Sequence, residues 1–364
     1  MKIKQGFVQE ILESMCGEDF QKLFDESLLI QYIDKKTGAV NRDCTARRNL
    51  ANLYAIYSMT HFYQNDYYEK RDEYDRFEGY HYNMLKDFAN SLYGGKKLQN
   101  HSFNDRLAGE FKRKKKIAGD LIINNEGRYK IHPDYLYVNN KDISNIVNVL
   151  VEKYIELIRT KDENTINMIS AIVSKTCLEE KRVALKNILA EKAEARLFEI
   201  ISYAILKRYY ASKTVWYGKD KDAIKEYNLN LYKTGRTNAN DGGIDFVLKP
   251  IGRFFQVTEV GKYNKYFLDI DKVMRYPITF VVKSDKQSEE IHIEMEESLK
   301  KQYGTEMSLI EAYRAAIEEI ITLENLNDII DEFSEKDIAD IVQEIILYFK
   351  LEMNIDDSEI ETMG

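Results

Sequence analysis

Polar residues interrupt two neighbouring apolar segments of the chain, and their types and spacing could serve catalysis. Asp245 stands inside the sequence IDFVL, and Gln256 and Thr258 interrupt FFQVTEV. A Lys-Pro-Ile-Gly sequence between the segments predicts a turn, so we expect two adjacent strands. Residues i and i+2 of a strand share a face, so Gln256 and Thr258 point the same way and Glu259 the other way. Buried polar groups need partners, water or a metal ion, so these residues are candidates for a functional site.

A further carboxylate lies in a helix predicted upstream of these strands. Glu199 is surrounded by apolar residues in the sequence EARLFEIISYAIL. Burying a carboxylate costs free energy unless it pairs with a cation or binds a metal ion. Glu199 is therefore a second site candidate. Arg196, three residues earlier on the same predicted helix, could pair with Glu199 instead, which would give the carboxylate a purely structural role.

A loop rich in Gly, Asn and basic residues connects this helix region to the first of the two strands. It contains Lys233, Arg236 and Asn238. The cationic side chains of lysine and arginine form charge-assisted hydrogen bonds with phosphate. We therefore expect this loop to contact a phosphate-bearing partner.

Taken in order, these segments resemble the PD-(D/E)xK nuclease superfamily, and most closely the type II restriction endonucleases. The series is a Glu-bearing helix, the basic loop, GGID, a hairpin, FFQVTE, a crossover helix and ITFVVK, over residues 190–285. The resemblance implies that Asp245, Glu199 and Gln256 are catalytic residues that hold Mg²⁺, for which Mn²⁺ would substitute. It further implies that Thr258 orients the attacking water.

Two positions depart from the pattern of that superfamily. Gln256 stands where the second acidic residue is usual, and Thr258 stands where lysine is usual. Threonine cannot supply the positive charge of lysine. Glu259, or Lys262 in the following loop, could complete the site, and the sequence leaves this choice open.

The resemblance also implies an activity and partners. We expect a Mg²⁺-dependent endonuclease that hydrolyses double-stranded DNA at a specific sequence and leaves 5′-phosphates. It would act as a cytoplasmic homodimer, beside a cognate DNA methyltransferase that it does not physically bind. One alternative is a methylation-dependent or phage-defence nuclease with the same site. Another is a DNA-binding protein that kept the fold without catalysis, and a third is a helical interaction protein.

The first part of the chain contains a predicted helix and a small β-hairpin within residues 102–132. Ser102 is a candidate N-cap, apolar residues recur on one face, and five basic residues end the helix at Lys116. The sequence Asn-Asn-Glu-Gly then predicts a hairpin turn. This order is found in winged-helix modules. If it binds DNA, Arg106, Lys112 and Arg113 are the expected contacts.

The remaining pattern predicts an α/β (α+β) protein with a helix-flanked mixed sheet as its nuclease core. We expect an α-rich DNA-recognition domain over residues 1–145 and a catalytic domain over 146–364. Residues 214–283 read as strands around one crossover helix, which implies a parallel strand pair. Helices are expected at 141–176 and 179–210, and acidic helices at 286–302, 307–323 and 335–352.

Composition narrows the class of protein. The 364 residues carry a net charge of −8, but residues 285–364 hold 23 acidic and 6 basic residues, so the first 284 carry +9. This asymmetry favours a polyanionic partner. Three separated cysteines without a CxxC motif argue against a disulfide framework or cysteine zinc site. No apolar run is long enough to span a membrane. The GxGxxG, GxxxxGK[ST], HExxH and GxSxG motifs are absent.

Overall fold

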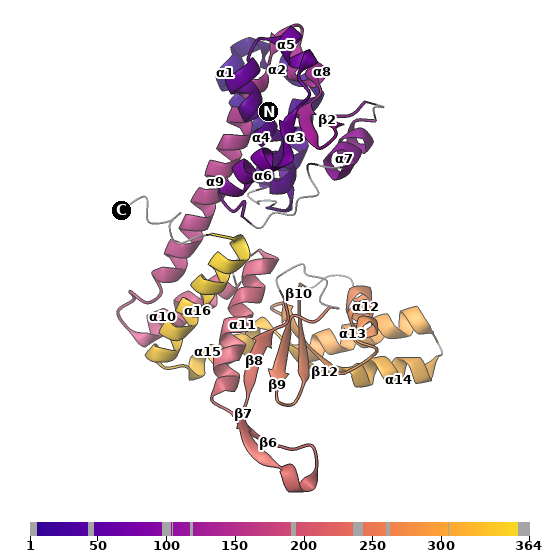
Figure 1. The fold of residues 1–364 in the computed structure, drawn as a ribbon. Helices are drawn as coiled ribbons and strands as arrows, with labels where there is room; N and C mark the ends of the chain where they lie inside the picture. The colour runs from indigo at the N-terminus through magenta and orange to yellow at the C-terminus, as the bar shows by residue number, and fades with distance from the viewer. Residues whose placement is uncertain are drawn as a thin grey trace. The chain divides into compact units, whose positions relative to one another are not determined.

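The computed structural model describes residues 6–42, 47–96, 103, 105–116, 119–190, 194–235, 243–259, 263–304 and 306–355. The chain divides into two compact units, one of Met1–Asn164 with Asn354–Gly364 and one of Thr165–Met353 (Figure 1). The sequence places a domain boundary at 145/146. The division instead falls inside the long helix α9 (Ser144–Ser170), because that helix is continuous and contributes residues to both units.

The first unit is mainly helical, as its apolar periodicity predicts. Its helices are α1 (Phe7–Cys16), α2 (Phe20–Glu26), α3 (Leu28–Thr37), α4 (Leu50–Tyr67), α5 (Arg71–Arg76), α6 (Tyr82–Ser91), α7 (Asp105–Lys115), α8 (Pro133–Leu136) and the first part of α9. Its strands are β1 (Tyr80–His81), β2 (Ile122–Asn125), β3 (Arg128–Ile131), β4 (Tyr137–Val138) and β5 (Lys141–Asp142).

The predicted helix and hairpin of this unit are confirmed as α7, β2 and β3. Phe103, Leu107 and Phe111 are buried, as their spacing of four residues requires for one helix face. The turn residues Glu126 and Gly127 both have positive φ, 48° and 85°, the geometry of a tight hairpin turn. The short strand β1 adds to the hairpin and gives the order β1-β3-β2.

The second unit contains the mixed sheet. Its helices are the rest of α9, α10 (Leu178–Ala190), α11 (Ala195–Ala211), α12 (Asn264–Lys272), α13 (Ser288–Tyr303), α14 (Met307–Ala316), α15 (Leu323–Glu332) and α16 (Glu335–Met353). Its strands are β6 (Thr214–Tyr217), β7 (Lys225–Asn228), β8 (Asn230–Lys233), β9 (Phe246–Lys249), β10 (Arg253–Glu259), β11 (Ile278–Lys283) and β12 (Ile317–Ile321). The fold is therefore α+β, as expected.

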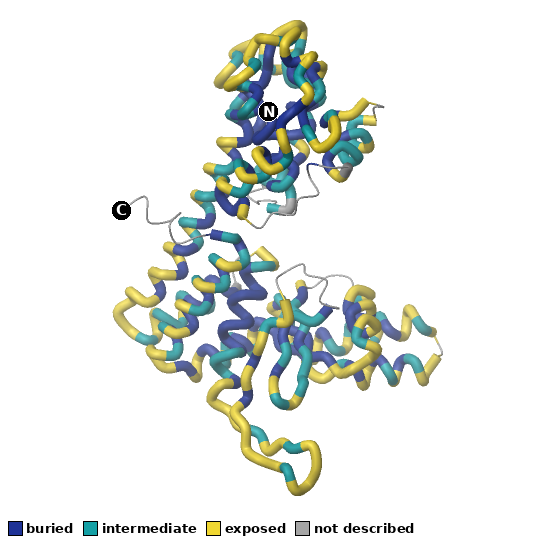
Figure 2. The backbone as a smooth tube through the Cα atoms, in the orientation of Figure 1, coloured by how far each residue is buried: buried dark blue, intermediate teal, exposed yellow. Residues whose placement is uncertain are grey.

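Five strands form one sheet in the order β12-β11-β10-β9-β8. β8, β9 and β10 are antiparallel neighbours, and the predicted crossover through α12 makes β10 and β11 parallel. Helix α11 covers one face, where Tyr203 meets Phe246 and Tyr210 meets Phe255, with ring centroids 5.2 and 5.8 Å apart. Figure 2 shows α11 and the central strands largely buried, whereas the hairpin of β6 and β7 is exposed.

One expectation for this unit is wrong. The predicted helix at 307–323 ends at Ala316 and continues as the strand β12, which pairs with β11. Glutamates favour a helix there, but pairing along a buried neighbouring strand overrides this local preference. The predicted helical region 179–210 is confirmed, and it consists of two helices, α10 and α11.

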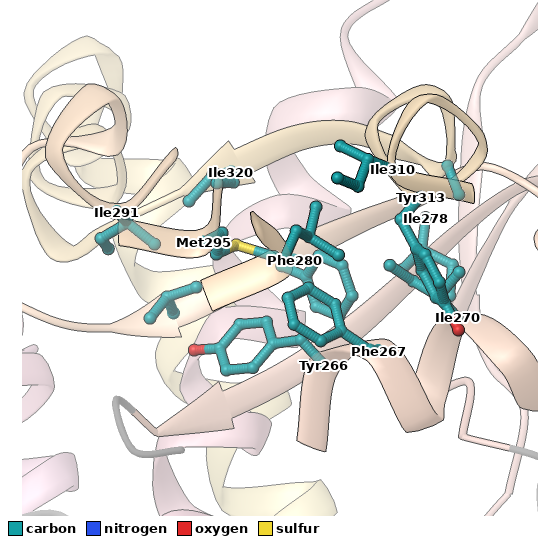
Figure 3. Close-up of a cluster of buried hydrophobic side chains, with 13 residues drawn as sticks. Tyr266, Phe267, Ile270, Ile278, Phe280, Ile291, Met295, Ile310, Tyr313 and Ile320 are labelled. Atoms are coloured by element: carbon teal, nitrogen blue, oxygen red, sulfur yellow. The ribbon is translucent and has the colours of Figure 1, made fainter. Parts of the chain in front are cut away.

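The other face of the sheet carries a hydrophobic cluster formed with α12, α13 and α14. Figure 3 shows Tyr266 and Phe267 of α12 beside Phe280 of β11, and the Tyr266 and Phe280 ring centroids lie 5.0 Å apart. The Tyr266 hydroxyl is buried close to the Thr258 hydroxyl. Burial, together with the nearby Asp269 carboxylate, raises the pKa of Tyr266 to about 12, although the Thr258 hydroxyl partly opposes this.

We predict that Tyr266→Phe changes stability little at pH 8 and stabilises the protein in alkali. Relative to pH 8, wild type should lose stability as pH rises from 10.0, the pKa of Tyr266 in the unfolded chain, toward about 12, its pKa in the folded protein, and phenylalanine cannot show this loss. At pH 11 the variant should exceed wild type by about 1 kcal/mol in free energy of unfolding. Urea denaturation at both pH values measures this, with exposed Tyr276→Phe as control. Equal behaviour of both variants would contradict the prediction.

Candidate active site

Asp245 lies at the entrance of β9, bound to the neighbouring strand β10. Its main-chain N–H donates to the Phe255 carbonyl oxygen over 2.9 Å, and its Oδ2 accepts the Val257 N–H over 2.7 Å. These two hydrogen bonds lie on either side of Gln256. The predicted convergence of the two strands at Asp245 and Gln256 is therefore confirmed, while the chemical role of these residues stays a prediction.

Gln256 and Thr258 share one face of β10, as their spacing predicts. They are register partners of Phe280 and Val282 on β11, which belong to the hydrophobic cluster under α12. Gln256 Nε2 donates to the Val257 carbonyl over 3.3 Å, but Oε1 is buried without a hydrogen-bond partner in the described part of the chain. A buried carbonyl oxygen in that state is costly, so Gln256 can accept a further donor or a cation.

On the other face of the sheet, Glu199, Lys233 and Glu352 form a buried ion triad. Lys233 Nζ lies 2.8 Å from Glu199 and 3.2 Å from Glu352, and all three side chains are less than a tenth exposed. Glu199 precedes Tyr203 by four residues, so both occupy the stripe of α11 that faces the sheet. Burial alone would lower the pKa of Lys233, but the two carboxylates outweigh it and raise that pKa above 10.5.

The triad revises two expectations. Lys233 is enclosed between carboxylates, so in this arrangement its ammonium group acts on Glu199 and Glu352 and does not serve as an exposed phosphate contact. Arg196, the alternative partner for Glu199, directs Nη1 toward Sδ of Met353 at 4.0 Å. Lys233 immediately precedes Thr234, whose N–H donates to the Asp245 carbonyl, so the triad adjoins the start of β9.

The structure describes only one of the other candidate residues near the site, Glu259. Glu259 lies on the face of β10 opposite to Gln256 and Thr258, is exposed, and pairs with Lys283 over 3.5 Å. Arg236, Asn238 and Lys262 lie outside the described residues. Glu259 is therefore poorly placed to complete a site formed with Gln256 and Thr258.

Two residues of α12 that the sequence did not single out lie against the same segment. Asp269 is 3% exposed, and its Oδ1 lies 2.6 Å from Lys272 Nζ. Gly243 has a φ of +83°, and a Cβ there would lie 3.2 Å from Asp269 Oδ1 and 3.4 Å from Lys272 Nζ. The signal in the sequence was an acid on the apolar stripe of α12, beside Tyr266 and Ile270.

The residues present fit a sparsely liganded magnesium ion. Among the described residues, no three His, Cys, Asp or Glu side chains gather as a ready-made metal site. Asp245 offers carboxylate oxygen, and Gln256 offers its unpartnered carbonyl oxygen. Mg²⁺ in phosphate-processing sites is commonly held by one or two carboxylates, with water and substrate phosphate completing the octahedron. Such a site would bind the metal strongly only with DNA present.

The candidate DNA contacts of the first unit differ in availability. Arg106 and Arg113 are exposed and lie seven residues apart, two turns along one face of α7. Lys112 instead pairs with Asp120 over 2.5 Å. Lys114 pairs with Glu110 over 2.6 Å, and Lys115 donates to Gln31 over 2.8 Å. The two arginines are therefore the better placed to bind a partner.

No protein-family model, curated protein sequence or solved structure matches the chain. Within the ranges that the structure describes, no helix combines the length and the apolar character of a membrane span.

Proposed function

We propose that this protein is a Mg²⁺-dependent endonuclease that cuts double-stranded DNA at a specific sequence, as the resemblance to type II restriction endonucleases implies. One observation carries the proposal. Asp245, at the start of β9, is hydrogen-bonded to β10, the central strand of the mixed sheet, on either side of Gln256, whose carbonyl oxygen has no hydrogen-bond partner among the described residues. The elements around them, α11, β8 to β10, α12 and β11, follow the order of that resemblance.

The reaction is hydrolysis of a phosphodiester bond. A water oxygen forms a bond to phosphorus while the bond from phosphorus to the 3′-oxygen breaks. The water gives up one proton to solvent, and the departing 3′-oxygen takes one, which leaves a 3′-hydroxyl and a 5′-phosphate. When bound, Mg²⁺ offsets phosphate charge, lowers the pKa of water and stabilises the leaving oxygen.

Each candidate residue would have a separate role in this reaction. Asp245 would hold the metal ion, and Gln256 would supply a neutral oxygen to the metal or to a water molecule. The Thr258 hydroxyl, on the same face as Gln256, would orient the attacking water. Glu199, expected to hold the metal ion, lies instead on the face of the sheet opposite to Gln256 and Thr258, where with Lys233 it would fix the position of the start of β9.

The first unit would recognise DNA. Its helix α7 followed by the hairpin has the order of winged-helix modules, and α7 exposes arginines that can contact phosphate or base edges. A homodimer would let each subunit cut one strand of a near-palindromic site. A cognate methyltransferase would protect host DNA in the cytoplasm without binding this protein.

We predict that replacing Arg106 and Arg113 together with alanine weakens DNA binding without loss of fold. Both side chains are exposed, so stability should change by less than about 0.5 kcal/mol. If both contact phosphate, the slope of log affinity against log salt should fall by about 2. Fluorescence anisotropy at several salt concentrations measures this. The exposed pair Lys300 and Lys301 on α13, changed to alanine, is the control, and an equal effect there would argue against a specific contact.

The test of the proposed function is cleavage of unmethylated plasmid or phage DNA by the full chain with Mg²⁺ or Mn²⁺. Discrete fragments with 5′-phosphate ends would support a sequence-specific endonuclease, and sequencing the ends would give the site. Fragments obtained only from methylated or otherwise modified DNA would support a modification-dependent nuclease. DNA binding without cleavage would overturn the proposal in favour of the non-catalytic alternative, which the neutral Gln256 and Thr258 make a specific competitor.

A further inference from the structure

The position where the superfamily pattern has lysine holds the neutral Thr258, so the positive charge must come from elsewhere if the chain cuts DNA. Phosphodiester hydrolysis adds negative charge to the phosphate in the transition state, which fixed cations stabilise. Lys233 is enclosed between Glu199 and Glu352, and Lys283 pairs with Glu259. These two lysines are therefore poorly placed for that role.

Lys272 at the end of α12 is placed differently. Its Nζ and Cδ would lie 3.4 and 3.1 Å from a Cβ at Gly243, so its side chain runs along the chain two residues before Asp245. Two residues span at most about 7 Å of extended chain. The Lys272 side chain is 53% exposed, so it can reach a phosphate bound beside Asp245.

Asp269 holds this ammonium group in place. Its carboxylate is 3% exposed and lies 2.6 Å from Lys272 Nζ, one helical turn earlier on α12. An ammonium group has three N–H donors, so one bond to Asp269 leaves two for phosphate oxygens. Because Gly243 has no Cβ, the chain before Asp245 can approach this pair closely. Asp269 thus holds the Lys272 ammonium group close to the segment from Gly243 to Asp245. Stability of α12 alone does not require this placement.

We infer that Lys272 is the cationic catalytic residue of the site, in contact with the scissile phosphate, and that Asp269 is its positioning residue. The inference rests on the proposed function. It adds a residue from α12 to the site in place of the lysine that Thr258 replaces. The bond changes remain those of the hydrolysis above, since Lys272 stays protonated and donates hydrogen bonds to the non-bridging phosphate oxygens.

The test compares Lys272→Met, which removes the charge at similar length, with Lys272→Arg, which keeps it. Single-turnover cleavage, DNA affinity without divalent metal and thermal unfolding are measured for each. We expect Lys272→Met to slow cleavage by about 100-fold or more, with DNA affinity within about 3-fold of wild type. The substitution leaves the buried Asp269 carboxylate without this ion pair and should lower stability, so cleavage is measured well below the unfolding temperature of the variant. Lys272→Arg should retain most of the rate. Lys301→Met, an exposed lysine of α13, is the control for net charge.

Four outcomes would overturn the inference. Lys272→Met could cleave within about 3-fold of wild type, or Lys272→Arg could lose as much rate as Lys272→Met, which would exclude the charge as the cause. A matched loss of DNA affinity would assign Lys272 to ground-state binding alone. Wild-type protein that cuts no DNA would overturn the proposed function, and this inference with it. Active wild type with an active Lys272→Met would overturn the inference alone.

Discussion

Asp245→Asn should reduce Mg²⁺-dependent cleavage of DNA by at least about 10³-fold, the largest effect on activity expected for this protein. The substitution keeps the size of the side chain and one carbonyl oxygen, so it can still accept the Val257 N–H. It removes the negative charge of Asp245, whose carboxylate accepts the N–H of Val257, the residue after Gln256. A loss of cleavage rate would then come from the missing negative charge that would hold the metal ion. It would not come from disruption of the β9–β10 strand pair.

Cleavage rates and unfolding should be measured on the same preparations. Asp285→Asn, at an exposed position after β11, is the matched control and should cleave like wild type. Excess Mn²⁺ should recover part of the lost activity if the defect is weak metal binding. Cleavage by Asp245→Asn within about 10-fold of wild type would place the active site elsewhere.

Lys233→Met should lower the free energy of unfolding by about 3–5 kcal/mol, the largest effect on stability expected for this protein. The change removes the ammonium group that bridges Glu199 and Glu352, and both carboxylates are less than a tenth exposed. Two buried like charges then face each other in a medium of low dielectric constant. Denaturant unfolding measures the loss, and Lys249→Met, on the exposed end of β9, should change stability by less than about 0.5 kcal/mol.

Neutralising the carboxylates provides the complementary measurement. The triple variant Lys233→Met, Glu199→Gln, Glu352→Gln should regain most of the lost stability, because no charge then remains in the triad. In wild type, the raised pKa of Lys233 means that its stabilising effect is complete below pH 10.5 and is lost as pH rises through the higher folded-state value. A triple variant as unstable as Lys233→Met would show that packing, not charge, accounts for the loss.

Local sequence was sufficient to predict the strand pair of the site. The alternation in IDFVL and FFQVTEV and the turn between them define β9 and β10, and the period of two places Gln256 and Thr258 on one face. The crossover length predicted the parallel β11 in the same way. Helix α7 and its hairpin followed from the spacing of Leu107 and Phe111 and from turn chemistry. These features depend on residues that are close together in the sequence, so the sequence pattern alone is sufficient to predict them.

The structural features that the sequence did not predict depend on contacts between residues that are distant along the chain. The sequence predicts Lys233 as a phosphate contact. In the structure it pairs with Glu352 of α16, which lies 119 residues later in the chain, and forms the centre of a buried ion triad. β12 forms because β11 offers a buried edge, although its Glu318 and Glu319 favour helix. Lys272 adjoins Gly243 only because α12 folds back over the sheet. Local pattern thus determined the elements and their faces, and tertiary packing decided which charges meet, because electrostatic partners are set by distance in space.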